Sequence, residues 1–183
     1  MARFYERLNT ELETFIGRQH VFFTASAPRV GGHVNLSPKG MDSFRVLDPN
    51  TVAYLDVTGS GAETAAHVRE NGRLTVMFCS FEAKPLILRL YGSGEVLLPA
   101  DPGWAMNRPL FPDHPGARAI VLLHVSEIQT SCGFGVPLMA YQGERGDLVH
   151  WARKKGEEGL RRYRREKNRE SMDGLPSGFG EDG

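Results

Sequence analysis

Residues 54–64, Tyr-Leu-Asp-Val-Thr-Gly-Ser-Gly-Ala-Glu-Thr, decide the fold, because a strand pattern ends in them and a helical pattern begins. Ser60 followed by Glu63 has the spacing of a helix capping box, and the two glycines allow close approach of the backbone. Free N–H groups at a helix start attract anions, and Thr58, Ser60 and Thr64 add hydroxyl donors. The segment therefore predicts a phosphate site, while a simple cap followed by a turn explains the same residues.

Short strand patterns separated by turn residues surround this segment. They lie at 20–27, 33–37, 43–47, 51–57, 73–80, 85–98 and 118–130. Helical spacing predicts an amphipathic helix over residues 4–16, a helix over about 62–70 that ends at Asn71-Gly72, a short helix over 101–108 and charged helices over about 148–168. Gly92 and Gly94 indicate a bulge or bend of the kind that lets a sheet curl. We expect a mainly β fold, an antiparallel split β-barrel of about six strands with flanking helices.

The chain of 183 residues is long enough for one domain with appendages. We expect a barrel domain with an N-terminal helix over 1–150, a charged C-terminal helix over 151–170 and a disordered, glycine-rich and acidic tail over 171–183. The net charge is zero, and no apolar run is long enough to cross a bilayer. The charged start lacks the pattern of a secretory signal, and the two cysteines are expected to be free thiols, so we predict a cytoplasmic protein.

Other polar side chains are candidates for binding an anion. One strand end carries an amide at Asn35, a hydroxyl at Ser37 and an ammonium group at Lys39, a set that suits a phosphate or the polar edge of a ring. A solvated lysine in a turn explains the same pattern. Arg89 lies in an apolar strand pattern and needs an anionic partner, which is either a bound phosphate or Glu95.

Three other classes of site have weaker support. The Gly-Ser-Gly segment resembles part of a dinucleotide fingerprint, with Glu82 about 20 residues beyond, but the third glycine and the repeated strand–helix units are missing. Basic residues over 161–167 are typical of nucleic-acid binding, but acidic interruptions favour a solvated helix face. The six histidines show no metal-ligand spacing, and no residue stands out as a catalytic acid, base or nucleophile.

The order of these segments over roughly residues 4–130 resembles that of the pyridoxamine 5′-phosphate oxidase-like family of split barrels that bind flavin mononucleotide (FMN). The likeness lies in Ser-Pro-Lys-Gly at 37–40, Gly-Ser-Gly at 59–61, Asn-Gly-Arg at 71–73 and Ser-Cys-Gly-x-x-x-Pro at 131–137, and it is closest to a branch of the family without a characterised reaction. The resemblance implies FMN bound without a covalent bond and hydride transfer through flavin N5 to or from a small molecule or a reduced nicotinamide. Two alternatives remain. The protein binds flavin or haem without turnover, or the basic helix serves as an interaction or nucleic-acid-binding element.

The resemblance also implies roles for particular residues. It implies that the phosphate and ribityl chain contact Ser37, Lys39, Thr58, Ser60, Gly61 and Thr64. It also implies that the backbone at Asp56 and Val57 borders the ring. Family members are typically homodimers with the flavin at the interface, so the region after Thr130 becomes a candidate contribution from a partner chain. The sequence lacks a counterpart of the Trp-containing, arginine-bearing C-terminal segment with which the true oxidases grip pyridoxine phosphate. We therefore do not expect vitamin B6 oxidation. Because the net charge is neutral, the basic helix has acidic interruptions and no apolar run spans a bilayer, we expect neither a nucleic-acid partner nor a membrane partner.

Overall fold

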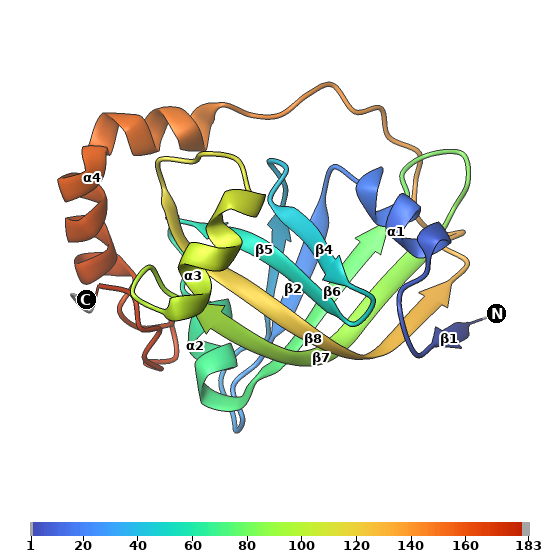
Figure 1. The fold of residues 1–183 in the computed structure, drawn as a ribbon, viewed down its shortest axis with the longest axis horizontal. Helices are drawn as coiled ribbons and strands as arrows, with labels where there is room; N and C mark the ends of the chain where they lie inside the picture. Colours follow the sequence, from blue (N-terminus) through green and yellow to red (C-terminus); the bar gives the residue numbers. More distant parts are fainter. Residues whose placement is uncertain (1, 181–183) are drawn as a thin grey trace.

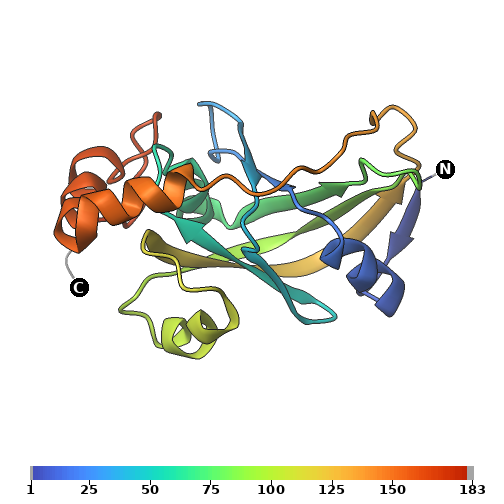
Figure 2. The same ribbon diagram turned by 90° about the horizontal axis from the view of Figure 1, so that it is seen from above.

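The computed structural model describes residues 2–180 and shows one curled antiparallel sheet with helices around it (Figures 1 and 2). The strands are β1 (Arg3–Tyr5), β2 (Phe22–Ser26), β3 (Asn35–Lys39), β4 (Phe44–Asp48), β5 (Thr51–Val57), β6 (Arg73–Cys79), β7 (Ile87–Leu97) and β8 (Ala117–Ser131). The helices are α1 (Thr10–Gly17), α2 (Glu63–Asn71), α3 (Pro102–Asn107), the 3-10 turn η1 (Arg108–Leu110) and α4 (Asp147–Lys167). The predicted mainly β class is confirmed, with eight strands in place of about six.

Within the described chain, the sheet runs in the order β3-β2-β6-β7-β8-β5-β4, and β1 adds to β8. The long pairing of β7 with β8 shifts its register between Tyr91 and Gly92. A Cβ atom on Gly92 would overlap the carbonyl of His124. The bulge predicted at this position is therefore possible only with glycine there. The bulge bends the longest strand pair and lets the sheet close around its core.

The barrel is split between β3 and β4, which end the sheet order without pairing with each other. Alternate side chains of the strands point inward and form the main core, in which Phe22, Tyr54, Phe78, Leu88 and Ile128 are almost fully buried. Lys39 on β3 and Asp56 on β5 lie on the polar side of this split. The opening of the barrel therefore places charged side chains beside the packed core.

The N-terminal helix is shorter than the predicted one. Residues 3–5 pair with β8 as strand β1, and α1 begins at Thr10. Asn9 determines this start, because its side-chain Oδ1 accepts a hydrogen bond from the backbone N–H of Leu12 at 2.9 Å. Phe4 is 61% exposed, so its place in the helical spacing does not reflect burial on the core.

Helix α2 begins one residue later than predicted, and the predicted capping box is wrong. Ala62 occupies the cap position without a side-chain hydrogen bond to the helix, and Ser60 lies outside it. At the other end Gly72 adopts a left-handed φ of 71°, as the Asn71-Gly72 pair predicts. The start of α2 thus keeps its free N–H groups.

The C-terminal region is also more structured than predicted. Helix α4 bends at Gly156, where φ is 65°, and the chain after it folds back against the barrel (Figure 1). Residues 171–180 do not form the disordered tail that we expected: Phe179 is 3% exposed and packs with Ala62, Ala65 and Ala119. The rest of the predicted tail, 181–183, lies outside the described residues. Among the described residues, no helix combines the length and the apolar character needed to span a bilayer.

Candidate functional site

A polar cleft of about 440 Å³ lies beside the split of the barrel, between β3, β5 and the start of α2. Its walls bring together main-chain and side-chain groups from three segments that are distant in sequence. They include Ser37, Lys39, Asp56, Val57, Ser60, Gly61, Glu63, Thr64 and Arg118. The N–H groups of residues 63–65 in the first turn of α2 border this cleft, and an α-helix supplies no backbone acceptor for them.

A buried ion-pair cluster forms the floor of the polar cleft. The Nε atom of Arg118 lies 2.7 Å from one carboxylate oxygen of Asp56, and Lys39 Nζ lies 3.0 Å from the other. Burial acts to raise the pKa of Asp56, but Arg118 and Lys39 outweigh it and hold the pKa below its usual value. Two cations on one carboxylate leave one positive charge at the cleft, and Glu63 on the opposite wall opposes it.

The loop at 58–61 is held from behind by the C-terminal region. Asn168 donates from Nδ2 to the carbonyls of Gly59 and Ser60 at 3.0 and 3.3 Å, and Arg118 donates to the carbonyl of Gly61 at 2.6 Å. Arg164 on α4 donates from Nε to Thr58 Oγ1 at 3.0 Å. The loop is therefore fixed by partners that lie 57 to 109 residues away in the sequence.

A chain of hydrogen bonds supports the other wall of the polar cleft. Asn35 Nδ2 donates to Thr64 Oγ1 at 2.9 Å, and Ser37 Oγ donates to Asn35 Oδ1 at 2.9 Å. Asn35 also lies 3.3 Å from Ser26 Oγ, which contacts the buried ring of His67 at 3.0 Å. These contacts fix the hydroxyls of Ser37 and Thr64 at the edge of the cleft.

An apolar cleft of about 600 Å³ continues from the polar one and shares Gly40, Met41, Ser43, Leu55 and Val57 with it. Aromatic side chains line its inner wall, namely Phe22, Phe44 and Phe78. The turn between β3 and β4 forms one side, and its Met41 and Asp42 adopt left-handed φ angles of 62° and 52°. Such backbone strain in non-glycine residues persists where the surroundings enforce it, and here it shapes the junction of the two clefts.

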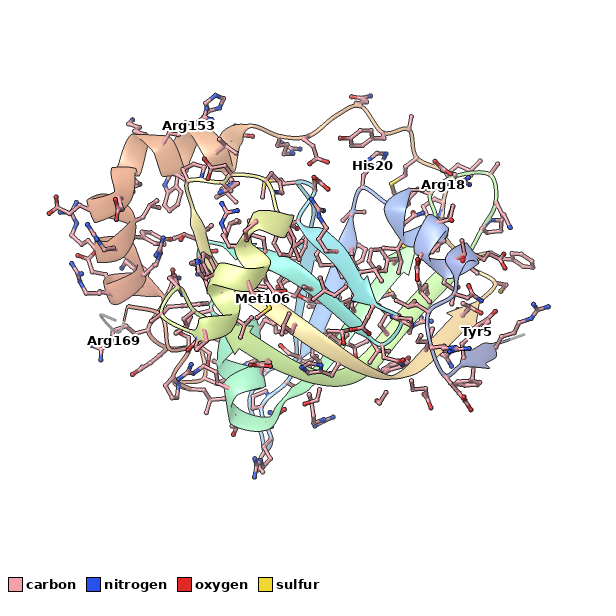
Figure 3. All side chains as sticks on the ribbon, viewed as in Figure 1. Tyr5, Arg18, His20, Met106, Arg153 and Arg169 are labelled. Carbon is pink, nitrogen blue, oxygen red and sulfur yellow. The ribbon has the colours of Figure 1, made fainter. Side chains whose placement is uncertain are left out.

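An extended strap, residues 132–146, connects β8 to α4 (Figure 1). Tyr141 of the strap stacks on His20, with ring centroids 3.6 Å apart and an angle of 5° between the planes. His20 lies beneath the strap, next to the end of α1 (Figure 3). Tyr141, Glu144 and Arg145 line the apolar cleft of their own chain. The region after Thr130 therefore contributes to the site within one chain, in addition to the expected role toward a partner.

His114 lines the apolar cleft, and one nitrogen of its ring is buried without a partner in the described chain. Its Nδ1 accepts a hydrogen bond from the N–H of Gly116 at 2.9 Å, so the proton of the neutral ring resides on Nε2. That Nε2 is buried and has no hydrogen-bond partner in the described chain. Burial lowers the pKa of His114, and Arg108 and Arg153 lower it further. The ring is thus a neutral donor at physiological pH.

Most of the residues predicted for the site meet at the polar cleft. Ser37, Lys39, Asp56, Val57, Ser60, Gly61 and Thr64 all line it. Lys39 is the last residue of a strand, not a turn residue, and Asn35 acts through its hydrogen bond to Thr64.

Two of the predicted residues lie elsewhere. Thr58 is fully buried, and its hydroxyl donates to the carbonyl of Gly116 at 2.9 Å, so its one proton is already in use. Arg89 lies outside both clefts and donates to Ser131 Oγ at 3.2 Å, so its partner in the described chain is neither a carboxylate nor part of the cleft.

Arg118, Asn168 and Arg164 were missed from the sequence. Arg118 precedes the most apolar run of the chain, and the reasoning that singled out Arg89 as an arginine in need of an anion applies to it equally. Asn168 and Arg164 carry no local signal, because they lie in a charged helix and its end. Arg164 turns toward the barrel, while Arg161 pairs with Glu157 on the helix surface at 3.2 Å.

Two sequence comparisons point to the same protein family. A family model described as pyridoxamine 5′-phosphate oxidase matches residues 8–132. The chain is 43% identical over 195 residues to the pyridoxamine 5′-phosphate oxidase family protein ustO of Aspergillus flavus, covering 96% of this chain and 78% of the relative.

Two solved structures share the fold. The crystal structure of HupZ from Group A Streptococcus is 22% identical and matches 66% of this chain and 91% of its own, with a TM-score of 0.52. A Lactobacillus delbrueckii protein with the suggested identity of a pyridoxamine 5′-phosphate oxidase is 20% identical and matches 68% and 94%, with a TM-score of 0.53. Both likenesses show the fold.

Proposed function

The chain belongs to the pyridoxamine 5′-phosphate oxidase family, and from that premise we propose that it binds FMN across the two joined clefts. The observation that carries the proposal is the continuity of a polar cleft at a helix start with an apolar cleft. The phosphate would lie at the polar end, against Lys39, Ser37, Thr64 and the N–H groups of α2. The ring would lie at the apolar end.

The residues present fit such a ligand. A phosphate needs several hydrogen-bond donors and some positive charge, and the polar cleft offers hydroxyls, free N–H groups and Lys39. A flat aromatic ring needs apolar walls, which Leu55, Val57 and the aromatic group of the apolar cleft provide. Glu63 disfavours a second negative charge at the polar end, so we expect the N–H and hydroxyl donors to contribute more than net charge.

We further propose an oxidoreductase. Bound FMN would supply hydride transfer at N5, and the protein would supply orientation and shielding from water. Aromatic side chains and residues of the strap line the apolar end, where the ring would lie. A small molecule or a reduced nicotinamide is the proposed substrate class.

A homodimer is the proposed assembly, with a second copy of the chain as the partner. Large apolar side chains remain exposed near the clefts: Val34 and Leu36 at the free edge strand β3, and Phe134, Leu138 and Met139 on the strap. Cys79 and Cys132 are both free, which fits the reducing cytoplasm as the proposed location. Light scattering of the purified protein would give twice the mass of the chain if the assembly is right, and the mass of a single chain would refute it.

The absorption spectrum of the purified protein tests FMN binding. We expect a flavin spectrum, or one that forms when FMN is added to the colourless protein. A colourless protein that takes up no FMN would refute the proposal. Anaerobic mixing of the flavin-loaded protein with a reduced nicotinamide then separates turnover from storage, because bleaching of the flavin band indicates hydride transfer and an unchanged band indicates binding alone.

Two substitutions test the position of the phosphate. Lys39→Ala and Ser60→Ala should each weaken FMN binding without unfolding the protein, since both residues line the polar cleft. We expect a loss of about tenfold or more for Lys39→Ala, the usual contribution of a hydrogen bond to a charged group. Lys84→Ala is the matched control, because that lysine is 87% exposed and distant from the clefts. Unchanged affinity in both test variants would place the phosphate elsewhere.

A further inference from the structure

Three consecutive carbonyls of the loop, those of Gly59, Ser60 and Gly61, all point to one side. The amide of Asn168 binds the first two at 3.0 and 3.3 Å, and a guanidinium N–H of Arg118 binds the third at 2.6 Å. Both donors are buried, since Asn168 is 0% and Arg118 is 5% exposed. Solvent therefore cannot easily replace either donor.

This arrangement fixes the direction of the N–H groups that follow. In a planar trans peptide the C=O of one residue and the N–H of the next point in opposite directions. The N–H groups of Ser60, Gly61 and Ala62 therefore face away from Asn168 and Arg118. In the described chain none of these three has an acceptor, and they continue the row of free N–H groups at residues 63–65. All six residues line the polar cleft.

Asn168 occupies the centre of the arrangement. Its Oδ1 accepts a hydrogen bond from Arg118 Nη1 at 3.0 Å, while its Nδ2 binds the loop. Arg118 is held in turn by Asp56 and by the ring of Phe179, whose centroid lies 4.2 Å from the guanidinium carbon. Each donor thus has one orientation, and a change at Asn168 removes both its own bonds to the loop and the acceptor that holds Arg118.

We propose that Asn168 is a positioning residue, which turns the loop N–H groups toward the phosphate of the flavin from behind the loop and touches no ligand itself. The inference rests on the proposed function, because it assumes that the phosphate occupies the polar cleft. The family model ends at residue 132, whereas Asn168 lies in the C-terminal segment beyond it. The flavin site of this chain is then completed by an element outside the shared barrel.

The sharpest test compares two ligands that differ only in the phosphate. Asn168→Ala leaves the charge of the site unchanged and frees the carbonyls of Gly59 and Ser60, so the peptides can rotate. We expect FMN to bind about ten- to a hundredfold more weakly, the loss of one or two hydrogen bonds to a charged group, while the affinity for riboflavin changes less than about threefold. Fluorescence titration measures both dissociation constants.

A control variant separates the effect of Asn168 from the general loss of a side-chain hydrogen bond to a carbonyl. Asn107→Ala is the control, because Asn107 also donates to a backbone carbonyl, that of Gly103 at 2.9 Å, but lies on α3 away from the polar cleft. If Asn168→Ala does not fold, Asn168→Ser replaces it, since a serine hydroxyl is too short to reach both carbonyls. Equal losses for FMN and riboflavin, or no loss for either, would overturn the inference. If the unmodified protein binds no FMN, the proposed function itself fails.

Discussion

Replacing Asp56 with asparagine should strongly destabilise the protein. Asp56 is buried and forms ion pairs with both Arg118 and Lys39, at 2.7 and 3.0 Å. The substitution keeps the shape of the side chain but leaves the 5% exposed Arg118 without a counter-charge. Breaking a buried pair from one side costs about 3–5 kcal/mol, a large part of the 5–15 kcal/mol by which a typical domain is stable. Urea unfolding followed by tryptophan fluorescence measures this difference in the free energy of unfolding.

The control and the pH dependence make the prediction specific. Asp42 forms an ion pair with Arg45 but is 74% exposed, so Asp42→Asn should change stability by less than about 1 kcal/mol. Because the pKa of Asp56 is lowered in the folded state, its contribution is complete above the unfolded pKa of about 3.9 and is lost as the pH falls through the folded value. The difference between the wild type and Asp56→Asn should therefore shrink in acid. A cost below about 1 kcal/mol at neutral pH would refute the reasoning.

Three further predictions follow from other parts of the fold. Phe179→Ala should lower the free energy of unfolding by about 3–5 kcal/mol, because the ring is buried against α2 and Arg118; a change near zero would return residues 171–180 to the disordered tail expected from sequence. His67 is fully buried and burial lowers its pKa, so the unfolded chain takes up a proton near pH 6.5 that the folded chain refuses. Stability should fall from pH 7.5 to 5.5, and less so in His67→Gln; equal pH dependence of the two proteins in urea unfolding would contradict this assignment. His20→Ala removes a stack worth about 0.5–1.5 kcal/mol, so amide exchange over 138–145 should become about two- to tenfold faster, and unchanged exchange would show that the stack does not hold the strap.

The barrel could be predicted from sequence because its signals are local. Strand β5 has the predicted bounds, and the ends of the other predicted strands differ from the observed ones by two residues or fewer. Alternation of side chains, turn residues and the paired glycines at 92 and 94 all act within a few residues of the position that they determine. Most of the polar residues predicted for the site lie on these elements or at their ends, and the fold brings them to one cleft.

The contacts that failed to appear in the sequence analysis link distant segments. Arg118 binds Asp56 across 62 residues, and Asn168 binds Gly59 across 109. The segment over 171–180 has the glycine and proline content of a disordered tail, but Gly174, Gly178 and Gly180 all adopt left-handed φ angles that let it fold back. The composition of the segment predicts disorder for the isolated peptide, but packing against the barrel orders it in the folded protein.

The dependence of the 58–61 loop on Arg164 and Asn168 has a consequence for the order of events during biosynthesis. The loop leaves the ribosome 106 to 109 residues before the side chains that hold it. At ordinary rates of translation that gap lasts on the order of ten seconds, a period in which strands β6, β7 and β8 are synthesised while the loop still lacks these two partners. Under the proposed function, the flavin site is then the last part of the protein to be completed, and a chain interrupted before α4 would form the strands of the barrel without a finished flavin site.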